Sequence, residues 1–148
     1  MNKEECVTKY LNAIYQNTRT ALQSIEDILP KIDNEALKSE LAREQDGYYL
    51  IEKECELFAK SERIENLKDN NFIEKAKLWT SINMSTLTNS TTRHNAELML
   101  MGTFMGIITC IKDEFDHKNI SAPLDEIIAK LKAQEKGNLE RLIDFLNA

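Results

Sequence analysis

The chain has 148 residues, 42% of them apolar and 30% charged, with a formal net charge of −6. This length predicts one domain, residues 1–148, with a core large enough to fold without disulfides. The acidic balance and the absence of a basic run argue against nucleic-acid binding, which requires clustered Lys and Arg. Only four glycines and two prolines occur, which favours long, uninterrupted helices.

Two apolar stripes in the first 60 residues predict an antiparallel pair of helices. The first helix is expected from about Glu4 to Leu29, because Pro30 stops it, and the second begins after Asp33 as its N-cap. Apolar side chains recur at alternating spacings of four and three, as in a helix-bundle seam. The two seams are Val7, Leu11, Ile14, Thr18, Ala21, Ile25 and Ile28, and Leu37, Leu41, Glu44, Tyr48, Ile51, Cys55 and Phe58. Their short connection makes the helices antiparallel neighbours.

A long connection follows the second helix. Residues 61–71 are polar, residues 72–87 predict a shorter helix, and a cluster of turn-forming residues at 88–92 predicts a break. The whole connection is about 30 residues long, enough to travel the length of a helix of about 25 residues. We therefore expect the second and third long helices to run parallel, with a crossover between them.

The third long helix is expected from about Thr91 to Phe115. Residues 98–111 are apolar nearly all round, so we expect this helix to be the most buried one. Gly102 and Gly106, four residues apart, let another helix approach closely. The methionines of this segment are expected to act as flexible core filler.

The fourth helix is expected to start between Ser121 and Pro123, since proline suits the first helical turn. Its seam is Leu124, Ile128, Leu131, Glu135, Asn138, Leu142 and Phe145. The order of hairpin, crossover and hairpin predicts an all-α four-helix bundle.

Two stretches carry a resemblance to a known class. NMSTLTNSTTRHNAELMLMGTFMGIITCIK (residues 83–112) and QEKGNLERLIDFL (residues 134–146) are similar to a group of small, uncharacterised bacterial proteins of the ferritin-like four-helix-bundle class. At the level of helix pattern the resemblance spans nearly the whole chain. It implies a ferritin-like fold with a short extra helix in the crossover, and it implies no particular activity.

Glu44 and Glu135 interrupt the apolar seams of the second and fourth helices. Ferritin-like di-iron proteins use a Glu from each of two helices and a Glu-x-x-His from each of the other two. Here the third residue after Glu44 is Gly47 and the third after Glu135 is Asn138. The imidazole ligands are therefore missing, which indicates a degenerate centre.

Three interpretations of these glutamates stay open on the sequence alone. Glu44, Glu135 and Asn138 could ligate a metal ion, iron or manganese, with Tyr48 and Thr18 as nearby oxygens. They could instead form a structural polar layer, bonded to one another, to a tyrosine or to water, with one carboxyl held neutral. A shift of one residue in the seam would place them at its edge, paired with Lys or Arg.

Cysteine and histidine positions add little chemistry. Cys6, Cys55 and Cys110 lie far apart without a CxxC pair, which argues against a disulfide framework or a zinc site. The Asp113-x-x-Asp116-His117 pattern lies at the expected end of the third helix, where a solvated, charged helix end is the simpler interpretation. The N-terminus has no apolar signal core, and the longest apolar run is too short to span a membrane.

These observations lead to a functional expectation. We expect a cytoplasmic, non-enzymatic helical protein with a structural or protein-interaction role, either self-associating or binding a protein partner, without a cofactor. The first alternative is a divergent metal-binding protein, an oxidase or a storage protein. The second is a small-molecule or lipid-binding bundle whose pocket is lined by the methionine- and glycine-rich third helix.

Overall fold

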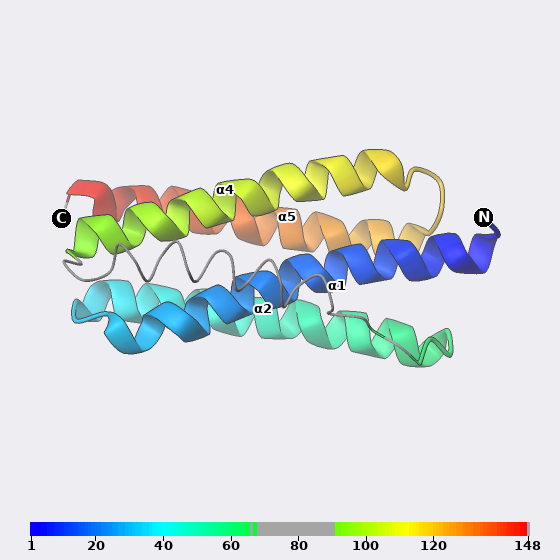
Figure 1. The fold of residues 1–148 in the computed structure, drawn as a ribbon, viewed down its shortest axis with the longest axis horizontal. Helices are drawn as coiled ribbons and strands as arrows, with labels where there is room; N and C mark the ends of the chain where they lie inside the picture. The colour runs from blue at the N-terminus through cyan, green and yellow to red at the C-terminus, as the bar shows by residue number, and fades with distance from the viewer. Residues whose placement is uncertain (66, 68–90, 148) are drawn as a thin grey trace.

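Four long helices make up the structure, a computed structural model that describes residues 1–65, 67 and 91–147 (Figure 1). They are α1 (Lys3–Ile28), α2 (Glu35–Ser61), α4 (Thr92–Asp116) and α5 (Ala122–Ile143), with short 3₁₀ turns at Leu29–Lys31 and Asp144–Asn147. These residues contain no strand, so the all-α prediction is confirmed. The helix expected at 72–87 lies outside the described residues.

The four helices lie side by side in a bundle. Figure 1 shows α1 and α2 antiparallel, α4 and α5 antiparallel, and α2 and α4 pointing in the same direction. Both α1 and α5 pack against α2 and against α4. The helices are antiparallel in each of these four pairs, whereas α1 and α5, which also contact each other, run in the same direction. The end of α2 and the start of α4 lie at opposite ends of the bundle.

Side-chain caps fix where the helices begin. Asn2, Asn34, Thr91 and Ser121 each accept a hydrogen bond from the backbone N–H three residues later. These bonds satisfy amide groups that have no partner inside a helix. The N-cap of α2 is thus Asn34, and the expectation of Asp33 is wrong by one residue. Both side chains can cap a helix, and the sequence did not distinguish them.

The core follows the predicted seams closely. Most of the expected positions of α1, α2 and α5 are buried, including Leu11, Leu41 and Leu131, which are fully buried. Four seam positions are only partly buried: Val7, Ala21, Phe58 and Phe145. Tyr10 is also fully buried, although it lies beside the predicted seam, and Ala59 rather than Phe58 is buried at the end of α2.

The prediction that the third long helix is the most buried one is wrong. In α4 an inner face with Ala96, Met99 and Cys110 packs into the bundle. Its outer face exposes large apolar side chains: Met101 59%, Phe104 55%, Met105 63%, Ile108 42%, Ile111 52% and Phe115 67%. One side of a helix is enough to contact two neighbouring helices. When a helix is apolar on all sides, the apolar side chains on its other side therefore remain exposed. No helix within the described ranges is long and apolar enough to cross a membrane.

Candidate functional site: a buried polar layer

The three residues predicted as a site lie inside the bundle. Glu44 on α2 and Glu135 on α5 are each 1% exposed, and Asn138 is fully buried. Tyr48, one turn after Glu44, is also buried. Burial of both glutamates excludes the interpretation that places them at the edge of the seam.

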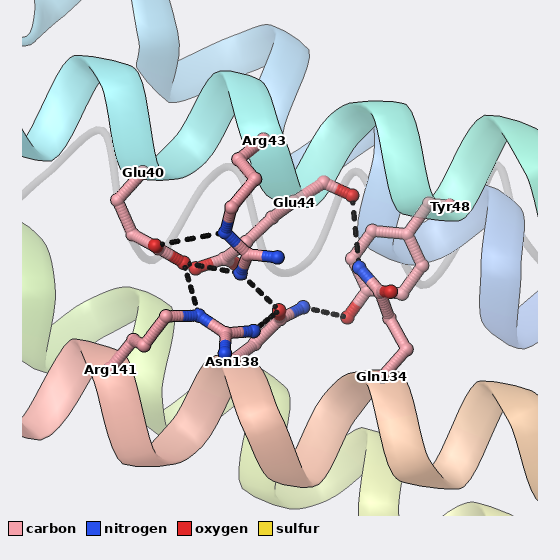
Figure 2. A network of polar contacts seen from close by, with 7 residues as sticks. All are labelled: Glu40, Arg43, Glu44, Tyr48, Gln134, Asn138 and Arg141. Atoms are coloured by element: carbon pink, nitrogen blue, oxygen red, sulfur yellow. Dashed lines mark hydrogen bonds and ion pairs between the residues drawn. The ribbon is translucent and has the colours of Figure 1, made fainter.

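Asn138 is the centre of the layer between α2 and α5 (Figure 2). Its Nδ2 donates to the Tyr48 hydroxyl at 3.2 Å. Its Oδ1 accepts from Nη2 of Arg43 and from Nη2 of Arg141, both at 3.0 Å. The amide oxygen that could serve as a metal ligand therefore already faces two guanidinium groups.

The same two arginines bind Glu40. Arg43 donates to both Glu40 oxygens, at 3.1 and 2.8 Å, and Arg141 Nε lies 3.3 Å from Oε2. Burial alone would raise the pKa of Glu40, but hydrogen bonds from Arg43 and Glu44 and the charges of both arginines outweigh it, so the pKa is lowered. Glu40 is thus the ionised carboxylate of the pair formed with Glu44.

Glu44 is the neutral member of that pair. Burial, together with the hydrogen bond to Glu40 and the negative charge of Glu40, raises the pKa of Glu44 to about 10, although Arg43 and Arg141 oppose the shift. A carboxyl that holds its proton at pH 7 can donate to Glu40. Its Oε2 is buried and has no hydrogen-bond partner among the described residues. This is less costly for a neutral acid than for a carboxylate.

Glu135 turns toward α4 and has different partners. The Cys110 thiol donates to its Oε1 at 3.3 Å, and Asn17 Nδ2 on α1 contacts Cys110 Sγ at 3.3 Å and the Gly106 carbonyl oxygen at 3.1 Å. Burial raises the pKa of Glu135 to about 8, against hydrogen bonds from Cys110 and Tyr48 that lower it. Glu135 is therefore largely protonated at pH 7. Through Cys110 and Asn17 the layer extends to α4 and α1, so all four long helices contribute to it.

Two glycines make room for these side chains. A Cβ at Gly106 would overlap the Glu135 carboxyl, closer than real Cβ contacts come. A Cβ at Gly47 would overlap the side-chain amide of Gln134, which donates to the Glu44 carbonyl oxygen at 3.2 Å. Gly47, three residues after Glu44, thus accommodates a side chain from α5.

The layer is continuous, but the two acids are not directly bonded. The described residues show no hydrogen bond between Glu44 and Glu135. Tyr48 lies between them: its hydroxyl accepts from Asn138 and forms a hydrogen bond with Glu135. Burial raises the pKa of Tyr48, so this hydroxyl stays neutral. No group of three or more His, Cys, Asp and Glu that could hold a metal ion occurs in the described part of the chain. Metal binding by Glu44, Glu135 and Asn138 stays a prediction.

Several residues of the layer were not predicted from the sequence to belong to the site. Glu40, Arg43 and Arg141 lie off the seams, and their long side chains reach the interior from its edge. A signal was present, because Glu40, Arg43 and Glu44 are spaced three and four residues apart on one helix face. The spacing of Cys110 gave no indication that its thiol donates to Glu135.

His117 is not a solvated helix end. It is 7% exposed, stacks on Tyr10 with ring centroids 4.6 Å apart, and its Nδ1 lies 2.8 Å from the Asp113 carbonyl oxygen. The Tyr10 hydroxyl donates to Asp125 at 2.6 Å. The pattern at this helix end therefore joins α1, α4 and α5 structurally.

Comparison with models of protein families, with curated proteins and with solved structures found no match to this chain.

Proposed function

We propose that this chain is a non-enzymatic helical-bundle protein with a structural or protein-interaction role, in which the buried polar layer aligns the helices. One observation carries the proposal: the Asn138 oxygen accepts from two arginines. Two fixed positive charges at a ligand oxygen oppose a cation there. Glu44 and Glu135 hold protons that a metal ion would have to displace.

The structural use of the layer is to specify how the helices meet. Asn138 and Tyr48 form their hydrogen bond only when α2 and α5 are correctly aligned along their axes. The hydrogen bond between Cys110 and Glu135 likewise forms only when α4 and α5 are aligned. A slip by one turn would leave buried polar groups without partners, which costs more than the bonds contribute. Buried polar groups fix register in other helical assemblies in this way.

In the proposed scheme the chain is a ferritin-like bundle with a degenerate di-iron-type centre. The positions three residues after the two glutamates hold Gly47 and Asn138, and the positive charges come from Arg43 and Arg141. A guanidinium group, which stays charged at any physiological pH, supplies the positive charge at these polar groups in place of a metal. A cytoplasmic location fits three free cysteines.

The competing proposal is a divergent metal-binding bundle with oxidase or storage activity. It draws support from two buried carboxyls in one layer and from the Glu44 Oε2 atom, which lacks a partner within the described residues. Iron or manganese would be the expected ion, since carboxylates suit both.

Metal content separates the two proposals. Protein purified without chelator, and then reconstituted with Fe(II) or Mn(II) and desalted, is expected to hold well below one equivalent of either metal. The variants Glu44→Gln and Glu135→Gln should not change that content. A stoichiometric metal that both variants abolish, while the exposed Glu140→Gln control retains it, would overturn the structural proposal.

A further inference from the structure

The outer face of α4 carries the largest run of exposed apolar side chains in the described part of the chain. Six residues, Met101, Phe104, Met105, Ile108, Ile111 and Phe115, recur at spacings of one, three and four, which places them along one side of the helix. Isolated exposed apolar residues are common, whereas a continuous stripe marks an interaction surface.

The size of this stripe fits a protein interface. With about 200 Å² for each large side chain and the exposed fractions above, the six residues present roughly 700 Å². If all six side chains were fully covered in both copies, two such faces would bury at most about 1,400 Å² in total, within the usual range for a specific interface of about 1,200–2,000 Å². One helix of each copy is therefore enough surface for a stable pair.

The charges that flank the stripe identify the partner. Exposed residues of α4 form two ridges with a spacing of four: Arg93, Glu97, Met101 and Met105, and Phe104, Ile108, Lys112 and Asp116. Reversing the helix about the midpoint between residues 104 and 105 exchanges the two ridges. Glu97 then opposes Lys112, and Met101 opposes Ile108. The face is thus complementary in charge to a reversed copy of itself.

We propose that α4 binds the α4 of a second copy of this chain, antiparallel and across a two-fold axis at residues 104 and 105. This inference rests on the proposed interaction role and names its partner. A two-fold interface uses the same patch on both copies, so each contact occurs twice. Met101, Phe104, Met105 and Ile108 form the apolar centre, with Glu97 facing Lys112 of the other copy at both ends.

The oligomeric state tests the apolar centre. By sedimentation equilibrium the protein is expected at twice its monomer mass of 17.1 kDa at micromolar concentration. Ile108→Glu should weaken association at least a hundredfold, because two unpaired carboxylates would be buried. The matched control is Leu57→Glu on α2, at a position that is 59% exposed and lies outside the stripe. It should leave the dimer intact, and circular dichroism should show that both variants fold.

A charge exchange tests the antiparallel register. Glu97→Lys should weaken the dimer about tenfold at low salt, because both ends change from attraction to repulsion. Combining it with Lys112→Glu should restore the original affinity. Restoration requires that residues 97 and 112 of the two copies face each other. A dimer held by the apolar side chains in another register would not regain its affinity.

The outcomes separate this inference from the proposed function. Wild-type protein that is monomeric throughout, an unaffected Ile108→Glu dimer, or a charge exchange without restoration would each overturn the pairing. None of these results concerns metal content. Stoichiometric metal in the bundle would instead overturn the structural role. The pairing of two copies would then still be decided by the oligomeric state.

Discussion

Replacing Glu135 with glutamine tests whether the buried layer holds a neutral acid. Burial raises the Glu135 pKa from 4.5 to about 8, so between these values the folded protein retains a proton that the unfolded chain has released. The free energy of unfolding therefore falls as pH rises through this window, by about 1.4 kcal/mol per pH unit. At pH 7 the cost is about 3 kcal/mol.

Glutamine has nearly the same shape and carries no proton to lose. Its Oε1 can still accept from the Cys110 thiol, and its amide can occupy the space that Gly106 leaves. We expect Glu135→Gln to be about 2–3 kcal/mol more stable than wild type at pH 7. The two proteins should differ by less than about 1 kcal/mol at pH 5, where the wild-type penalty is small.

Urea unfolding at pH 5, 6, 7 and 8 measures this directly. Glu140→Gln, at an exposed position on the same helix, is the control and should stay within about 0.5 kcal/mol of wild type. A Glu135→Gln effect that is independent of pH, or a variant that is less stable than wild type at pH 7, would refute the reasoning.

Two further predictions concern packing in the layer, and thermal unfolding measures both. Gly106→Ala should cost about 2 kcal/mol, although alanine favours helix, because its Cβ overlaps the buried Glu135 carboxyl. Gly137→Ala is the comparison and should stay within about 0.5 kcal/mol of wild type, because its Cβ would meet the Arg141 guanidinium at 3.1 Å and the helix preference of alanine offsets the small shift needed; a gain at Gly106 would contradict the close approach. Asn138→Ala should cost about 3 kcal/mol, because Tyr48 and the arginines lose their common partner. A loss below about 1 kcal/mol would show that Asn138 is dispensable.

The bundle was predictable because its signal is repeated many times. Each long helix carries several turns of apolar periodicity, so a local error such as Asp33 for Asn34 does not change the outcome. Glu44 and Glu135 were placed inside by the same logic, since residues on either side of them in the seam are buried.

The partners of those glutamates were not predictable to the same degree. Arg43 and Arg141 reach the interior with long, flexible side chains, and periodicity describes only where a side chain starts. The proton on Glu44 depends on the ionised Glu40 one turn away and on burial by other helices. Such coupling arises only after the helices are packed.

The prediction that α4 is the most buried helix failed for a different reason. When nearly every position of a helix is apolar, the stripe no longer identifies the inner face. Gly106 gave the better clue, because it lies against Glu135 on α5. The remaining apolar positions, such as Phe104, then fall outside the bundle and form the face assigned to a second copy.

The protonation of the two buried carboxyls tests the central claim most directly. In protein labelled with ¹³C at the glutamate side chains, carboxyl resonances can be followed by NMR as the pH is raised. We expect the Glu44 resonance to keep the shift of a neutral acid at pH 7, and Glu135 to titrate with a midpoint near 8. Both resonances at the ionised shift by pH 6 would contradict a neutral structural layer and would favour carboxylates prepared for a cation.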